Sequence, residues 1–488
     1  MKLTRRAFAT ALAALGTCSV ASARSGAGSP VLGDWFGSVT HGSDTGTIAF
    51  RFERKNGTTI ARLWNPALHF YGTIAAPSVF DEHGNVVVRG YALRARVQGD
   101  TMSGTVLDGE TRVVLHRVAS IPLQAPARPV VSAGPRAIWT YRGAAFWGSP
   151  LVIDGVAFAG DERGTLHAVR AHDGTPLWRY AAGAALRGSP LHDGEAVLVL
   201  DDDGVLHRVH RERGVATLKT SLAARIARKG PSATDGSWDY GSPAPLVAGG
   251  TVYVGTADGV MHAVDARTGA PRWRYRARGP IRSSAAADAQ HLYFGDRSGA
   301  VTALHRSNGK ELWRRQTGGP IVMAPVPFED TILIGSRGSE LMALSKASGA
   351  VRWRRFYWAS WIESAPALAG GTAYVGSSDL RTVRAFDPAT GRTLWETDVY
   401  GMSWGTPLID GGSVYAGTAG LVGGSPQHHE PGLVALNARD GAMRWRTPGA
   451  ARGPYVCGYS CGPVLGEAGT VLFASVDGTL SGFRIGGA

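Results

Sequence analysis

Aromatic, arginine and carboxylate side chains gather in the longer, non-repetitive segments of this 488-residue chain. The segments around Trp238 and Trp361 bring all three types close together. Surfaces rich in Trp, Tyr and Arg bind protein partners well, and flat ligands stack on such rings. We therefore expect a ligand or partner face built from Trp147, Arg187, Trp238, Asp239, Tyr240, Arg282, Trp358, Trp361, Glu363, Trp404 and Tyr455.

Other residues of chemically active types lack the spacing of a metal or catalytic site. His428, His429 and Glu430 are adjacent, so on an extended loop their side chains point apart, and no further ligand is identifiable. His167, His207, His262 and His305 lie near the third strands of their repeats, which favours a packing role. We predict no catalytic residue and no metal site.

The first 23 residues have the pattern of an export signal. Arg5 and Arg6 precede an apolar run from Ala7 to Leu15, which is too short to span a bilayer. Ala21-Ser22-Ala23 fits a signal-peptidase site. The paired arginines are typical of the twin-arginine route, so we expect a periplasmic or secreted protein.

Two cysteines, Cys457 and Cys461, remain after cleavage of that signal. An oxidising compartment favours a disulfide between them. A lipid anchor at Cys18 is not expected, because the preceding Thr17 is too large for a lipidation motif. No later stretch is apolar and long enough to span a membrane.

Composition excludes several protein classes. The chain has 14 Trp and is 44% hydrophobic, which excludes a disordered protein. It has 67 Gly, and each Gly inside a helix costs about 1 kcal/mol, so a mainly helical fold is disfavoured. The formal charge of +13 favours anionic partners such as lipid head groups or acidic proteins. Nucleic acid is not expected outside the cytoplasm.

An internal repeat of roughly 40 residues dominates the chain after position 137. Its pattern is Ala, Gly six residues later and Trp four further on, as in Ala263, Gly269 and Trp273. A buried indole would pack against the neighbouring repeat and satisfy its N–H there. We expect this structural role for Trp139, Trp178, Trp273, Trp313, Trp353, Trp395 and Trp445.

Each repeat has the pattern of four short strands separated by Gly-containing turns. In the first repeat these strands are Ser149–Ile153, Val156–Ala159, Thr165–Arg170 and Thr175–Tyr180. Four strands per repeat are typical of a β-propeller blade. The sequence therefore predicts an all-β protein with eight blades over residues 137–488.

The eighth repeat stops after three strands, near Phe483. Ala137–Arg142 supplies a candidate for its missing outer strand, because Trp139 lies in step with the repeat tryptophans. Sharing one blade between the two ends would close the ring and remove an exposed sheet edge.

Residues 31–118 lack the repeat and carry alternating apolar and polar runs, such as Thr47–Glu53 and Val86–Tyr91. These runs predict a small antiparallel domain, either a sandwich or an open barrel. Residues 119–136 are proline-rich and are expected to be a linker.

The long insertions all fall on one side of the predicted propeller. Strand direction alternates within a blade, so the second turn and the link to the next blade lie on the same face. Leu218–Tyr240, Arg354–Glu363 and Thr447–Ser460 are such links, and Leu421–Pro431 replaces a second turn. This face is the functional candidate. Five candidates directly precede an innermost strand and should point at the central funnel: Trp147, Arg187, Arg282, Glu363 and Trp404.

The repeats resemble the pyrroloquinoline-quinone (PQQ)-like propeller repeat, whose hallmark is Ala-Leu-Asp-Ala-x-Thr-Gly-x-x-x-Trp. Ala263–Trp273 (AVDARTGAPRW) and Ala385–Trp395 (AFDPATGRTLW) match it closely. The resemblance covers residues 137–488 and implies the fold more strongly than the function. Relatives include quinoprotein alcohol dehydrogenases and the outer-membrane protein assembly factor BamB family, which binds partners and catalyses nothing.

Two functions follow from the resemblance. A PQQ-dependent dehydrogenase would need an aromatic platform, cations for the cofactor, a Ca²⁺ site and a base. Its candidates are Trp238 or Trp404 for stacking, Arg187 or Arg282 for pairing, and Glu363 with Asp235 or Asp239 for Ca²⁺ and base. The family's adjacent cysteine pair and a haem motif are missing. We therefore expect a non-catalytic assembly or scaffold protein without a cofactor, with the PQQ- and calcium-dependent oxidoreductase as the alternative.

Overall fold

The computed structural model describes residues 30–42, 44–81, 83–88, 92–106, 110–223, 241–358, 360–421, 429–450, 456–467 and 469–485. The chain divides into two compact units near residue 130, an N-terminal barrel and a C-terminal propeller. None of the described residues belongs to a helix with the length and hydropathy that crossing a membrane requires.

The N-terminal unit is a closed, eight-stranded antiparallel barrel. Its strands are β1 (Gly33–His41), β2 (Asp44–Lys55), β3 (Thr58–Asn65), β4 (Phe70–Phe80), β5 (Asn85–Val88), β6 (Leu93–Gln98), β7 (Thr101–Val106) and β8 (Thr111–Val118), with a 3₁₀ turn η1 (Pro66–Leu68) before β4. We expected a sandwich or an open barrel, but the barrel is closed. β1 pairs with β8 from Asp34 opposite Val118 to Thr40 opposite Arg112, which closes the barrel. Its interior is filled by large side chains that include Trp35, Phe50 and Met102.

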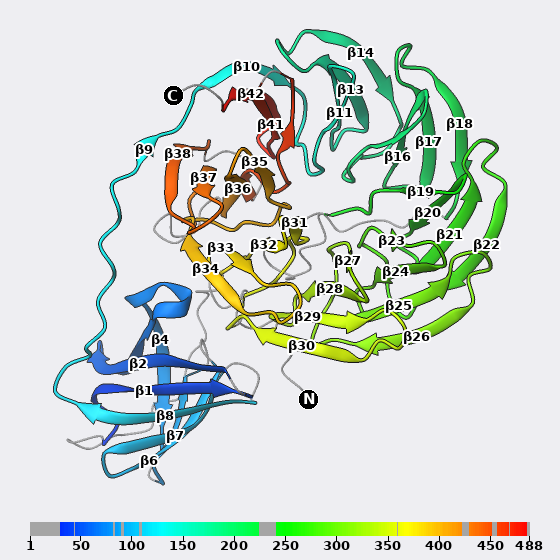
Figure 1. The fold of residues 1–488 in the computed structure, drawn as a ribbon. Coiled ribbons are helices and arrows are strands. Elements are labelled where there is room, and N and C mark those ends of the chain that lie inside the picture. Colours follow the sequence, from blue (N-terminus) through cyan, green and yellow to red (C-terminus); the bar gives the residue numbers. More distant parts are fainter. Residues whose placement is uncertain are drawn as a thin grey trace. The chain divides into compact units, whose positions relative to one another are not determined.

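The C-terminal unit is an eight-bladed propeller, as the sequence predicts, and each blade is built on four antiparallel strands (Figure 1). Blades I to VIII are numbered in chain order. Their innermost strands are β11 (Leu151–Ile153), β15 (Leu191–Asp193), β19 (Leu246–Ala248), β23 (Ala286–Ala287), β27 (Val326–Phe328), β31 (Ala367–Ala369), β35 (Leu408–Asp410) and β40 (Val464–Leu465). The second strands are β12 (Val156–Gly160), β16 (Ala196–Leu200), β20 (Thr251–Gly255), β24 (His291–Gly295), β28 (Thr331–Ser336), β32 (Thr372–Gly376), β36 (Ser413–Leu421) and β41 (Thr470–Ala474).

The two outer positions of each blade complete the sheets. The third strands are β13 (Thr165–Arg170), β17 (Val205–His210), β21 (Val260–Asp265), β25 (Ala300–His305), β29 (Glu340–Ser345), β33 (Thr382–Phe386), β37 (Gly432–Asn437) and β42 (Thr479–Arg484). The outermost strands are β14 (Pro176–Ala181), β18 (Ala216–Ser221), β22 (Pro271–Arg276), β26 (Glu311–Gln316), β30 (Val351–Phe356), β34 (Thr393–Asp398), β38 (Met443–Pro448) and β10 (Ala137–Arg142).

The expected closure of the ring is confirmed. β10 pairs with β42, from Ala137 opposite Phe483 to Arg142 opposite Thr479, and so completes blade VIII (Figure 1). Trp139 packs in a buried cluster with residues of both blade VIII and blade I, among them Leu472 and Val169. The start of the propeller and its end are therefore joined by one shared sheet.

The linker also contributes a strand. β9 (Ser132–Ala133) pairs in parallel with Trp445 and Arg446 of β38, so blade VII gains a fifth strand. Gly134 follows it, and a Cβ at that position would lie 2.5 Å from the ring of Trp445. The glycine therefore permits this close approach.

The repeat tryptophans bridge neighbouring blades. Their indole N–H groups donate to backbone carbonyls of the following blade at 2.7–3.1 Å: Trp139 to Ala171, Trp178 to Arg211, Trp273 to Arg306, Trp313 to Lys346, Trp353 to Pro388 and Trp395 to Ala438. The repeat glycine of the next blade lies against each ring, as Gly174 does on Trp139 with φ +73°. The Ala–Gly–Trp spacing thus reflects contacts between blades.

A second kind of side-chain contact, which the sequence did not predict, joins blade VIII to blade I and blade I to blade II. Tyr141 Oη lies 2.9 Å from His167 Nδ1, and His167 Nε2 lies 2.9 Å from Asp161 Oδ2. Tyr180, His207 and Asp201 repeat this arrangement one blade later. The interval of six residues between each Asp and His is a signal that the sequence carries.

Blade III keeps only part of this arrangement. His262 Nε2 faces Thr256 Oγ1 at 3.2 Å in the place of the aspartate, and the charge of Asp258 only partly offsets the factors that lower its pKa. Burial and the nearby positive charge of Arg274 lower the pKa of His262 to about 4. His262 is therefore neutral in the folded protein at neutral pH.

This depressed pKa predicts a loss of stability in mild acid. The unfolded state binds the proton near pH 6.5 and the folded state only near pH 4, so the free energy of unfolding falls as the pH drops through that window. The loss is at most about 3 kcal/mol. Urea unfolding of the wild type at pH 7 and pH 4.5 should show a larger loss than the same measurement on His262→Gln. Equal losses for the two proteins would contradict this assignment.

Candidate functional site

The links between blades and the turns between second and third strands emerge on one face of the propeller, here called the loop face. Backbone hydrogen bonds of 2.8–3.1 Å join each turn to a link: Glu162 to Ala145, Asp202 to Ala185, Arg297 to Pro280, Arg337 to Pro320, Ser378 to Trp361, Ala419 to Met402 and Val476 to Gly458. The corresponding link residue of blade III lies outside the described residues. These bonds hold the links in one conformation around the axis.

One position in each link forms what we call the inner ring: it lies three residues before the Pro, or in blade IV the Ala, that leads into the innermost strand. It comprises Trp147, Arg187, Ser242, Arg282, Val322, Glu363, Trp404 and Ser460, each directly before an innermost strand. All five expected funnel residues belong to this ring. Most of its members are buried, so they contact other loop residues before they contact solvent.

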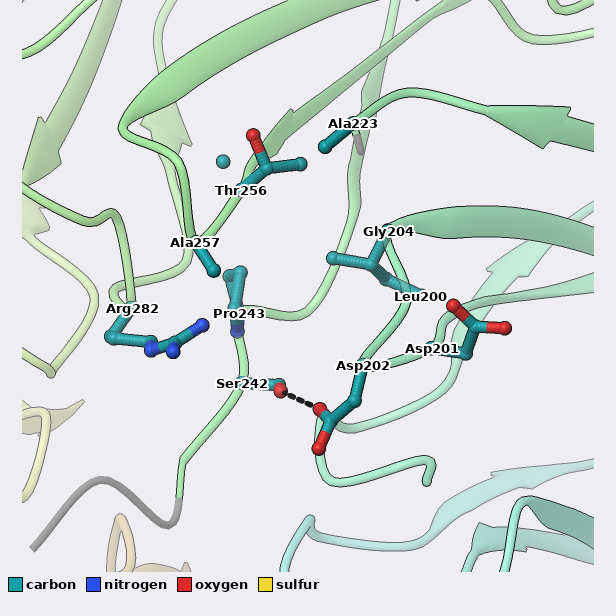
Figure 2. Close-up of a pocket in the computed structure, with 11 residues that line it drawn as sticks. Leu200, Asp201, Asp202, Gly204, Ala223, Ser242, Pro243, Thr256, Ala257 and Arg282 are labelled. Atoms are coloured by element: carbon teal, nitrogen blue, oxygen red, sulfur yellow. Dashed lines mark hydrogen bonds between the residues drawn. The ribbon is translucent and has the colours of Figure 1, made fainter. Parts of the chain in front are cut away.

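Between blades II and III the ring is closely packed (Figure 2). The Arg187 guanidinium is paired with the Asp202 carboxylate, and Ser242 Oγ donates to the same carboxylate at 3.0 Å. Asp202, Ser242 and Arg282 line a cavity of about 20 Å³, which is room for one water molecule. Arg187 therefore binds a carboxylate of the adjacent turn in blade II.

Between blades V and VI an ion pair lies in the wall of the funnel. The Arg337 guanidinium is bonded to the Glu363 carboxylate, and their side chains are only 6% and 3% exposed. Arg337 Cζ also lies 4.6 Å from the ring centroid of Trp361. Burial raises the pKa of the neighbouring Asp379 to about 6, and the charge of Glu363 adds to that shift. This sector therefore combines a buried pair with a carboxyl that titrates near neutrality.

Two further arginine–aromatic contacts follow around blades VI and VII. Tyr400 lies between two guanidinium groups, with Arg381 Cζ and Arg446 Cζ each 5.9 Å from its ring centroid. Asp398 and Glu430 pair with these arginines at 2.5 and 3.2 Å. Tyr400 and Arg381 both have positive φ, of 64° and 54°. Bulky residues rarely adopt this conformation, and such strain is concentrated at functional sites.

The remaining expected site residues are distributed over the same face. Trp147 Nε1 donates to Glu162 Oε2 at 3.0 Å. Trp404 is buried in the link of blade VII, and Trp358 packs edge-on against Phe356 with ring centroids 5.4 Å apart. Four expected residues lie outside the described part of the chain: Trp238, Asp239, Tyr240 and Tyr455.

The structure does not show the expected disulfide. Cys457 and Cys461 are both buried and free. Cys457 pairs with Gly420 through β39 (Val456–Gly458), whereas Cys461 packs in the cluster around Trp139 and its thiol donates to the Ala474 carbonyl at 3.3 Å. The two side chains therefore face different neighbours. Cys18 lies outside the described residues.

Two of the residues expected to hold PQQ and calcium have other partners in this structure. Arg187 and Glu363 are bonded to Asp202 and Arg337. No three His, Cys, Asp or Glu side chains in the described ranges are grouped for a metal ion. Glu430 pairs with Arg446, and His428 lies outside those ranges.

The sequence predicted which residues lie in the links, but it did not predict the turn residues to which they are bonded. Asp202, Arg337 and Arg381 lie in turns between second and third strands, which the sequence analysis treated as ordinary hairpin turns. A signal existed, because Asp202 and Arg337 occupy the same position in two repeats, directly after the second strand.

Fold and site together define an eight-bladed propeller of PQQ-like repeats with a bonded inner ring. The profile of one protein family, described as outer membrane protein assembly factor BamB, matches residues 130–217, 217–321 and 298–480. The chain belongs to this family. No curated protein matches the sequence.

Solved structures similar to this chain share its fold at low identity. The computationally designed Ika8 protein is 13% identical, with a TM-score of 0.58 over 72% of this chain and 100% of that one. Quinohemoprotein alcohol dehydrogenase from Comamonas testosteroni is 15% identical, with a TM-score of 0.55 over 72% and 77%. BamB from Moraxella catarrhalis is 18% identical, with a TM-score of 0.48 over 70% and 93%.

Proposed function

We propose that this chain is an envelope binding protein that holds a protein partner on the loop face of its propeller. One observation carries the proposal: the arginine–aromatic contacts of the described loop face are concentrated in blades V to VII, around Trp361 and Tyr400. Trp, Tyr and Arg in packed surroundings are the residues that dominate protein interfaces. Trp358 and Trp361 remain partly exposed there and are the natural anchors.

Family membership supports an assembly role for this binding. The matching family is described as an outer membrane protein assembly factor, so the partner is a protein of the apparatus that assembles outer-membrane proteins. The carboxylates and arginines of the inner ring serve to hold the loops in place, and no catalytic step is assigned to them.

Binding is tested with paired variants. Trp358→Ala and Trp361→Ala remove the two partly exposed rings, and Leu177→Ala and Leu394→Ala remove exposed apolar side chains from outermost strands as controls. Chemical cross-linking in envelope extracts identifies the partner, and its affinity for each purified variant is then measured. We expect losses of tenfold or more for the tryptophan variants and less than twofold for the controls. Wild-type affinity in both tryptophan variants would refute the proposed face.

We propose that the twin-arginine route exports this protein to the periplasm. The route requires the paired arginines, so Arg5→Lys with Arg6→Lys should leave the uncleaved precursor in the cytoplasm. Immunoblotting of cell fractions measures this directly. A Lys2→Gln variant keeps the arginine pair and should be exported normally. Export of the double variant at the wild-type level would show that another route is used.

A further inference from the structure

The positive charge of the propeller is confined to one arc. Residues 241–358, which form blades III to V, contain 16 Lys and Arg against 8 Asp and Glu. Residues 130–223, which form blades I and II together with strands β9 and β10 of blades VII and VIII, contain 10 of each. Residues 360–485 contain 8 basic and 10 acidic residues. The net charge of the ring therefore comes from blades III to V.

Within this arc the arginines gather on the outermost strands β22, β26 and β30, which follow one another along the rim (Figure 1). These strands carry a single carboxylate, Glu311. Their arginines are Arg272, Arg274, Arg276, Arg314, Arg315, Arg352, Arg354 and Arg355, here called the basic arc. The outermost strand of blade VI, β34, instead carries Glu396 and Asp398.

The geometry of β22 presents the charges to solvent. Arg272, Arg274 and Arg276 alternate with Trp273 and Tyr275, and all three arginines are exposed. Alternate residues of a strand lie on one side at intervals of about 6.7 Å. The strand therefore displays a row of guanidinium groups on the side away from its packed rings.

Nearby carboxylates cancel only part of this charge. Arg272 pairs with Asp265 at 2.8 Å, Arg352 with Asp330 at 3.1 Å and Arg354 with Glu340 at 3.6 Å. Arg314 is paired with Glu311, so four of the eight arginines have a carboxylate partner. Arg274 has no carboxylate within 4.0 Å among the residues that the structure describes. Arg315 donates from Nε to the Gly349 carbonyl, a neutral group, so its charge is retained.

We propose that the basic arc docks on an anionic lipid surface, with its guanidinium groups bound to head-group phosphates. Of the 16 basic residues in blades III to V, 14 are arginines, and arginine binds phosphate through two parallel hydrogen bonds. The charges are spread along a rim, a pattern that mobile phosphates can match without a fitted partner surface. A hollow of about 290 Å³ beside Arg272 and Arg306 lies within the arc and is large enough for a phosphate head group.

The test uses the mature chain and vesicles of stated composition. Cosedimentation is measured with phosphatidylcholine alone and with phosphatidylglycerol and phosphatidylcholine in equal parts, at low and at physiological salt. One triple variant, Arg274→Gln, Arg276→Gln and Arg352→Gln, removes charge from the arc. The matched control removes the same charge from exposed positions of blades I and II, namely Arg163→Gln, Arg170→Gln and Arg213→Gln.

We expect binding to the anionic vesicles that weakens with salt and falls at least tenfold in the first triple variant, since each arginine near such a surface contributes about 1 kcal/mol. The control triple variant should lose less than threefold in its affinity for anionic vesicles. Trp361→Ala should bind the vesicles like the wild type, even if it no longer binds its protein partner. Equal binding to neutral vesicles, no binding at low salt, or equal losses in both triple variants would overturn the proposal. Capture of an acidic protein by the arc without vesicle binding would also overturn it.

Discussion

Deletion of Ala137–Arg142 is expected to leave the propeller unable to fold cooperatively. The deletion removes β10, exposes the edge of β42 and separates blade VIII from blade I. An open ring leaves apolar faces of two blades in water, and an exposed strand edge promotes association. Thermal unfolding followed by circular dichroism should show no sharp transition, and gel filtration should show aggregates.

A point substitution measures the same closure in a protein that still folds. Trp139→Ala removes a buried ring and its hydrogen bond to the Ala171 carbonyl, so the free energy of unfolding should fall by about 3–5 kcal/mol. Ser132→Pro affects only the two-residue strand β9 and should cost about 1 kcal/mol or less. A similar small loss for both variants would show that closure by β10 contributes little.

Loss of Glu363 is expected to be the most damaging change on the loop face. Glu363→Ala leaves the Arg337 guanidinium buried without its carboxylate, which should lower the free energy of unfolding by about 3–5 kcal/mol. The link that carries Trp361 should become mobile as well, so affinity for the partner should fall in the same variant. Urea unfolding and the binding assay measure the two effects separately.

The double variant Arg337→Met with Glu363→Leu is the control for this pair. Removing both charges avoids an unpaired buried ion, and well-packed apolar replacements are often neutral for stability. We expect the double variant to recover most of the stability that Glu363→Ala loses. A double variant as unstable as the single one would show that the pair acts through contacts other than its charge.

The sequence predicted the propeller well because its repeats encode contacts between blades. The interval from Gly174 to Trp178 recurs since these glycines, except Gly269, pack on the indole of the preceding blade, where a Cβ would collide. Closure by Ala137–Arg142 was predictable for the same reason, because Trp139 occupies the repeat position. Such signals are local in sequence and periodic.

The partners within the site were not predictable in this way. Arg337 and Glu363 are 26 residues apart and belong to different blades, so no local spacing reveals their contact. Closure of the N-terminal barrel depends on the pairing of β1 with β8, whose residues are far apart in the chain. The choice between an open and a closed barrel depends on the curvature of eight strands together, which alternation of polar and apolar residues does not encode.

Hydrogen–deuterium exchange of the complex tests the central claim most directly. With the partner bound, we expect slower exchange in the links and second turns of blades V to VII, including the backbone around Trp361 and Tyr400. Turns on the opposite face, such as the one at Gly370-Gly371 in blade VI, should exchange as in the free protein. Protection confined to that opposite face would contradict binding through the loop face.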